Sequence, residues 1–93
     1  MKFEWDPEKA QDNLLKHGIL FEEAQTVFLD FHSIEIFDEN ITDEDRFVRI
    51  GYSYKTRLLT VVFCERDNEY IRIISARAAT AEERELYEER LRS

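Results

Sequence analysis

One stretch decides the fold that we expect, and it reads Glu69-Tyr70-Ile71-Arg72-Ile73-Ile74-Ser75-Ala76-Arg77-Ala78-Ala79-Thr80. Its apolar and β-branched residues predict a strand, in which alternate side chains point to opposite faces. A helix should begin directly afterwards, because Thr80 and Glu83 form a capping box. Arg72 and Arg77 would then lie on the strand and at its end, where permanent cations favour an anion. Alternatively, both arginines pair with nearby carboxylates, since buried charges usually do.

The length and composition limit the class of protein. The 93 residues suffice for a single domain over residues 1–93 with a modest core. No apolar run approaches the roughly 20 residues of a membrane span, and the acidic N-terminus does not resemble a signal peptide. A single cysteine, Cys64, cannot form an internal disulfide, so we expect a cytoplasmic protein.

The charge is unevenly distributed along the chain. The net charge is −8, and residues 1–45 contain 3 basic and 13 acidic residues. Residues 46–77 instead contain 7 basic and 3 acidic residues. An acidic protein can still bind phosphate if its cations share one face, because screening limits fields to about 8 Å at physiological salt.

Periodicity and turn residues predict the order α-α-β-β-β-β-α. Asp6-Pro7 begins a first helix that runs to about His17 and ends at Gly18. The remaining elements are expected at a second helix over 21–30, strands over 32–37, 46–52, 57–64 and 69–77, and a last helix over 81–91. Residues 1–5 form a brief edge strand or a packed arm, and residues 38–45 form an acidic loop. The class is therefore α+β, with a helical hairpin, a four-stranded antiparallel sheet and a C-terminal helix.

The strand over 57–64 is the most apolar and should be central in the sheet. We expect a core that contains Leu59, Val61, Phe63, Ile71 and Ile73. In the last helix, Leu86, Tyr87 and Leu91 are the expected apolar anchors.

Several kinds of chemistry lack a signal in this sequence. There is no phosphate-binding loop, no dinucleotide-binding glycine pattern and no cysteine cluster for zinc. His17 and His32 lie on different predicted elements, which is a weak basis for a metal site. We therefore expect no metal and no cofactor. Cations, a histidine at a helix end and carboxylates suit metal-free cleavage of RNA, which needs a stabilised phosphate and proton transfer.

The arginines of the last hairpin are the candidate catalytic residues. Arg66 and Arg72 could share a face by strand parity, and Arg77 at the strand end is freer to turn. We expect these three arginines to clamp the scissile phosphate, with His17 or Lys16 close enough to assist. His17 could equally be a solvated residue at a helix C-terminus. The expected RNA contacts are Lys16, Arg46, Arg49, Lys55 and Tyr87, although Tyr87 could instead be a core residue.

Five blocks of the chain carry a resemblance to a known family. They are Phe3-Glu4-Trp5-Asp6-Pro7-Glu8-Lys9-Ala10; the segment from Asn13-Leu14 through Lys16-His17-Gly18-Ile19 to Phe21-Glu22-Glu23-Ala24; Asp45-Arg46-Phe47-Val48 with Ile50-Gly51; Arg57-Leu58-Leu59 with Val61; and Ile71-Arg72-Ile73-Ile74-Ser75-Ala76-Arg77 with Ala79-Thr80, Glu83-Arg84 and Tyr87. In this order they resemble the BrnT family of toxins.

The resemblance implies a RelE-like fold and a ribonuclease toxin of a bacterial type II toxin–antitoxin system, which inhibits translation. It also implies a partner, a BrnA-type antitoxin with a ribbon-helix-helix DNA-binding part, in a heterotetramer with the toxin. One position departs from the family, because Ala78 stands where lysine is common. A second hypothesis remains open, in which the chain is a non-catalytic interaction protein whose acidic surface binds a basic antitoxin or regulator. Growth arrest on expression without a partner would favour the toxin.

Overall fold

The computed structural model describes residues 1–37, 45–67 and 69–93. Its elements follow the order β1 (Lys2–Glu4), α1 (Pro7–His17), α2 (Phe21–Ala24), η1 (Gln25–Leu29), β2 (Ile34–Ile36), β3 (Phe47–Tyr52), β4 (Leu58–Arg66), β5 (Tyr70–Ala78) and α3 (Ala81–Arg92). The predicted acidic loop, apart from Asp45, and Asn68 of the predicted hairpin turn lie outside the described residues.

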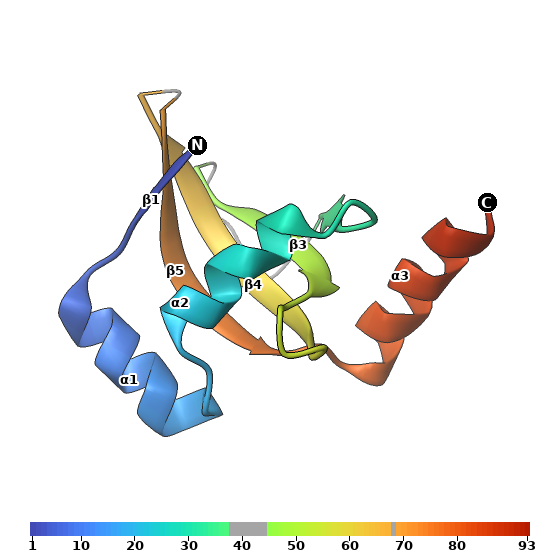
Figure 1. Ribbon diagram of the computed structural model, residues 1–93, viewed down its shortest axis with the longest axis horizontal. Helices are drawn as coiled ribbons and strands as arrows, with labels where there is room; N and C mark the ends of the chain where they lie inside the picture. Colours follow the sequence, from blue (N-terminus) through green and yellow to red (C-terminus); the bar gives the residue numbers. More distant parts are fainter. Residues whose placement is uncertain (38–44, 68) are drawn as a thin grey trace.

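The strands form one mixed sheet in the order β1-β5-β4-β3-β2 (Figure 1). The prediction of four antiparallel strands is confirmed for β2 to β5, and β4 is the central strand as expected. The strand count was wrong, because β1, the edge strand expected as one alternative for residues 1–5, joins the sheet as a fifth strand parallel to β5. The long stretch of chain between β1 and β5 allows the two strands to run parallel, which makes the sheet mixed.

The first helix begins and ends where the sequence predicts. The Asp6 side chain accepts a hydrogen bond from the Glu8 backbone, and Pro7 occupies the first turn. Gly18 ends α1 in the left-handed conformation at a φ of 71°. The predicted second helix is shorter than expected, because α2 tightens after Ala24 into the 3-10 helix η1.

The sheet separates two layers of apolar side chains. We call the side covered by α1, α2 and η1 the helix face, since Ile19, Phe21, Ala24 and Val27 pack there against the sheet (Figure 1). The sheet contributes a matching set to this cluster, namely Leu59, Val61, Ile73 and Ala76. All five predicted core residues, including Phe63 and Ile71, are buried.

The last helix packs on the other side of the sheet. Tyr87 of α3 is buried against Ile34, Ile50 and Leu58. The expected anchors Leu86 and Leu91 are wrong, because each side chain remains about half exposed. The third expected anchor, Tyr87, is confirmed, since its hydroxyl donates to Asp30 Oδ2 at 2.6 Å and its ring packs edge-on against Tyr52.

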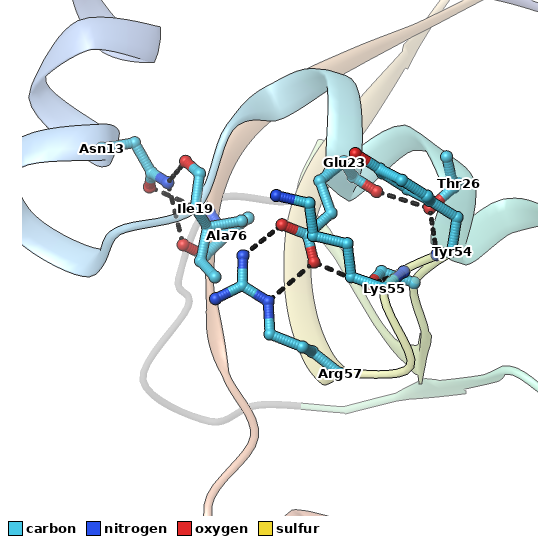
Figure 2. A network of polar contacts seen from close by, with 9 residues as sticks. Asn13, Ile19, Glu23, Thr26, Tyr54, Lys55, Arg57 and Ala76 are labelled. Carbon is cyan, nitrogen blue, oxygen red and sulfur yellow. Dashed lines mark hydrogen bonds and ion pairs between the residues drawn. The ribbon is translucent and has the colours of Figure 1, made fainter.

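Two polar contacts join the helices to the sheet (Figure 2). The amide of Asn13 on α1 donates to the carbonyls of Ile19 and Ala76 and accepts the Ala76 N–H, all within 3.0 Å. It satisfies the edge of β5 beyond the short strand β1, whose pairing ends at Arg72.

The buried carboxylate of Glu23 on α2 is the second contact. It accepts hydrogen bonds from both Arg57 and the Ser53 hydroxyl. These hydrogen bonds, led by the one from Arg57, outweigh burial and lower the pKa of Glu23.

Candidate functional site

A β-bulge turns the last arginine of β5 to the same side of the sheet as the other two. Val62 pairs with Ser75 and Phe63 with Ile73, so Ile74 is an extra residue between them. Arg72 and Arg77 are five positions apart and would face opposite sides of a regular strand. With the bulge, both lie on the side opposite α1 and α2.

Arg66 lies on the same side as these two arginines. It pairs with Tyr70, and Arg72 pairs with Cys64, two residues from Arg66 on β4. We call this side the arginine face. The sequence therefore predicted correctly that Arg66 and Arg72 share a face, and the bulge adds Arg77 to it.

Arg77 is held in one orientation by Glu83 of α3. Its two terminal nitrogens donate to the two carboxylate oxygens at 2.7 and 2.9 Å. The same carboxylate accepts the Thr60 hydroxyl and the Thr80 backbone N–H, each at 2.9 Å, and the predicted capping box is present. The side chain of Arg77 is 36% exposed, so its guanidinium remains open to solvent.

Glu83 is fixed in its ionised form by these contacts. Burial raises the pKa of this carboxyl, but the hydrogen bonds from Arg77, Thr80 and Thr60 outweigh burial and lower it to about 2. A carboxylate with so low a pKa is a poor base at neutral pH. Its role in the geometry is to orient Arg77.

Arg72 is paired as well, with Glu4 of β1 at 2.6 Å. The structure therefore contains the alternative arrangement, in which both strand arginines pair with carboxylates. Arg66, at the end of β4, is exposed and has no ion pair among residues 1–37, 45–67 and 69–93.

The three arginines form a row along the sheet. Arg72 and Arg77 are five positions apart along β5, which corresponds to roughly 15 Å. Arg66 lies near Arg72, diagonally across the β4–β5 pair. Because arginine side chains are long, Arg72 and Arg77 could reach one phosphate from both sides, and Arg66 could reach a neighbouring phosphate of the same strand.

Two tyrosines and two further cations on this face were not among the sequence candidates. Lys2 lies over the ring of Tyr70, with Nζ 5.7 Å from the centroid, and Tyr70 pairs with Arg66. Arg84 of α3 donates to the Tyr52 hydroxyl at 3.1 Å. Arg84 could have been found from the sequence, because it directly follows the capping-box residue Glu83. Lys2 could not, since only the parallel pairing of β1 brings it to this face.

His17 and Lys16 do not join the arginine row. Both are exposed at the end of α1, which packs on the helix face. A phosphate held by Arg72 would lie on the opposite side of the sheet from them. A proton-transfer role for His17 stays a prediction, without support from this arrangement.

Arg49 and Tyr87, two of the residues expected to contact RNA, make structural contacts, and the RNA contact of Arg49 stays a prediction. Arg49 lies on the helix face, where its guanidinium stacks over Phe28 and donates to Ser33 at 3.2 Å. Tyr87 is 3% exposed, so its expected base stacking is wrong and its alternative reading as a core residue is confirmed. Desolvation raises the pKa of the Tyr87 hydroxyl.

The other expected contacts are separate from the row. Lys55 is exposed in the turn between β3 and β4, with Nζ 5.8 Å from the centre of the Tyr54 ring. Arg46 is half-buried just before β3. Their expected contacts with RNA stay predictions.

Metal and membrane features can be assessed for the described parts of the chain. Within residues 1–37, 45–67 and 69–93, no group of three or more His, Cys, Asp and Glu side chains could hold a metal ion. Within the same residues, every helix is too short or too polar to span a bilayer.

Comparison with known proteins identifies a matching family and a similar solved structure. A family model described as "Ribonuclease toxin, BrnT, of type II toxin-antitoxin system" matches residues 5–83. The crystal structure of the Brucella abortus ribonuclease toxin, BrnT, is similar with a TM-score of 0.68 and 28% sequence identity. The similarity covers 86% of this chain and 97% of the Brucella chain. No protein of curated function matches the chain.

Proposed function

Because the chain belongs to the BrnT family of ribonuclease toxins of type II toxin–antitoxin systems, we propose that it cleaves RNA internally, without a metal, on its arginine face. The toxin stops translation by removing RNA and is neutralised by a BrnA-type antitoxin with a ribbon-helix-helix part, in a heterotetramer. The reaction class is inferred from the family, and the location of the active site is inferred from the residues of this chain.

The observation that carries the location is the row formed by Arg66, Arg72 and Arg77 on one face of two neighbouring strands. Arginine donates several hydrogen bonds in a planar arrangement that matches phosphate oxygens. The fixed orientation of Arg77 by Glu83 lowers the cost of arranging these donors during the reaction. Tyr70 adds a ring on which a base could stack beside the backbone contacts.

The chemistry that fits this row is attack by the neighbouring 2′-hydroxyl of the RNA. The 2′ oxygen loses its proton and attacks the phosphorus, the bond from phosphorus to the 5′ oxygen breaks, and that oxygen takes up a proton. The products are a 2′,3′-cyclic phosphate and a free 5′-hydroxyl. Arg72 and Arg77 would stabilise the extra negative charge on the pentacovalent phosphate. Glu83 is a positioning residue in this scheme, because its pKa of about 2 makes it a weak base.

The experiment that tests this function incubates the purified protein with a single-stranded RNA in excess EDTA. We expect cleavage at an unchanged rate and fragments that end in a 2′,3′-cyclic phosphate, as identified by mass spectrometry. Loss of cleavage in EDTA with recovery on adding Mg²⁺ would overturn the metal-free mechanism. A 5′-phosphate on the downstream fragment would overturn attack by the 2′-hydroxyl.

A second function is favoured by one observation. Arg72 and Arg77 are already neutralised by Glu4 and Glu83, which is what a non-catalytic interaction protein would contain. Such a protein would leave growth unaffected when expressed without its partner. A catalytic toxin would arrest growth in the same experiment.

A further inference from the structure

Two large apolar side chains project into solvent from the turn after η1. Leu29 is 83% exposed and Phe31 is 97% exposed, on either side of Asp30. We call this pair the Leu29–Phe31 ridge. In Figure 1 this turn leaves the helical segment on the side that faces α3. Among the described residues, the Phe31 ring contacts His32 edge-on but stays almost fully exposed, so it does not gain the free energy of burial.

The ridge is bordered by two surface hollows. One holds about 310 Å³ and is lined by Leu29, Asp30, Tyr52 and Tyr54 among others. The other holds about 340 Å³ and is lined by Phe31, Arg90 and Leu91 among others. Tyr54 and Leu91 are themselves large and exposed. The first hollow is mainly apolar and extends the apolar surface of the ridge, so side chains of a partner could insert there, whereas the second hollow is mainly polar.

Hydrogen bonds to Asp30 fix the turn that carries the ridge. Asp30 Oδ2 accepts the Tyr52 backbone N–H at 2.9 Å and the Tyr87 hydroxyl at 2.6 Å, and its Oδ1 accepts the His32 backbone N–H at 3.0 Å. The turn is thereby tied to β3 and to α3. A preformed surface of this kind binds without the cost of ordering a loop.

We propose that the Leu29–Phe31 ridge is the docking surface for the antitoxin, which covers it with an apolar segment bordered by lysine or arginine. This proposal rests on the proposed function, because a type II toxin has a protein antitoxin as its partner.

Charge favours this occupant over a second copy of the chain. Residues 1–45, which include the ridge, contain 13 acidic and 3 basic residues, and Arg90 of α3 is a cation that lines the hollow beside Phe31. Each copy carries a net charge of −8, so two copies repel each other while a basic partner is attracted.

The ridge is separate from the arginine row. It precedes β2, at one end of the sheet order, while the row lies on β4 and β5 toward the other end. A change at the ridge should therefore affect partner binding without affecting RNA cleavage. This separation allows the two proposals to fail independently.

The test measures binding of the product of the adjacent reading frame, purified on its own, to the full-length protein by calorimetry. The variant Leu29→Ser/Phe31→Ser should bind at least about 30-fold more weakly, as expected for lost central anchors. Leu15→Ser on α1 is the matched control, since Leu15 is also 79% exposed but lies away from the ridge, and it should bind within about twofold of wild type. The association rate, measured separately by surface plasmon resonance, should fall as salt rises.

Wild-type affinity of the ridge variant would overturn the proposal. So would a wild-type dimer that the ridge substitutions convert to a monomer, because the occupant would then be a second copy. Melting temperatures of both variants should match wild type, since these side chains are exposed. Lost binding by the ridge variant in a protein that cleaves no RNA would overturn the proposed function and support the docking surface. Full cleavage with unchanged binding would support the proposed function and overturn the docking surface.

Discussion

Replacing Glu83 by glutamine should destabilise the protein and release Arg77. Glutamine keeps the shape and one acceptor oxygen of the side chain but removes the charge that faces the guanidinium. A fully buried pair costs about 3–5 kcal/mol when one partner is removed, and an exposed pair costs about 0–1 kcal/mol. Glu83 is buried whereas Arg77 is 36% exposed, so the pair lies between these limits.

We therefore expect Glu83→Gln to lower the free energy of unfolding by about 2 kcal/mol at pH 7. For a domain of this size, that loss corresponds to a melting temperature lower by roughly 8–16 °C. The assay is thermal unfolding followed by circular dichroism. The matched control is Glu82→Gln, an exposed neighbour in the first turn of α3, which should melt close to wild type.

The pH dependence identifies the charge as the cause. The pKa of Glu83 falls from 4.5 to about 2 on folding, so its contribution is complete above pH 4.5 and decreases as the pH falls toward 2. The difference between wild type and Glu83→Gln should therefore shrink by more than half between pH 7 and pH 3. A variant that melts within 2 °C of wild type at pH 7, on the order of 0.5 kcal/mol or less, would refute the reasoning. An equal difference in stability between wild type and Glu83→Gln at pH 7 and at pH 3 would refute the assignment of the effect to charge.

Two further predictions concern the framework of the sheet. Val61→Ala should lower the unfolding free energy by about 1–3 kcal/mol in chemical denaturation, because it opens a cavity at a fully buried position of β4; a loss under 0.5 kcal/mol would place Val61 outside the core. Asn13→Ala should cost about 2–4 kcal/mol, since it leaves the Ala76 N–H and two carbonyls without their partner, and rapid exchange of the Ala76 amide should accompany it; a protected Ala76 amide in the variant would contradict that account.

Local chemistry made the ends of several elements predictable. Asp6-Pro7, Gly18 and the Thr80–Glu83 capping box each satisfy backbone groups within a few residues, and all three lie where expected. The central position of β4 followed from its apolar run, which only a strand covered on both faces can bury.

Features that depend on contacts far apart in the sequence could not be predicted. The bulge at Ile74 moves Arg77 to the arginine face, and no local signal distinguishes Ile74 from Ile73. The parallel pairing of β1 with β5 joins residues nearly seventy positions apart, as the contact from Arg72 to Glu4 shows.

The candidate site was predicted in part for the same reason. Alternation along β4 and β5 placed Arg66 and Arg72 together, because strand parity is a local property. The positions of Arg49 and Tyr87 depended on what packs against them. Phe28 and Asp30, from the segment around η1, turn these two side chains into structural contacts.

The central claim is that RNA is cleaved on the arginine face, and the rate of RNA cleavage by single arginine variants tests it most directly. Arg72→Ala and Arg77→Ala should each cut the rate about 100-fold or more, as expected for a lost contact to the transition state. Arg92→Ala, an exposed arginine at the end of α3, is the matched control and should cleave at the wild-type rate. Melting temperatures of the same samples must show that each variant is folded. Folded Arg72→Ala and Arg77→Ala proteins with full activity would contradict the account.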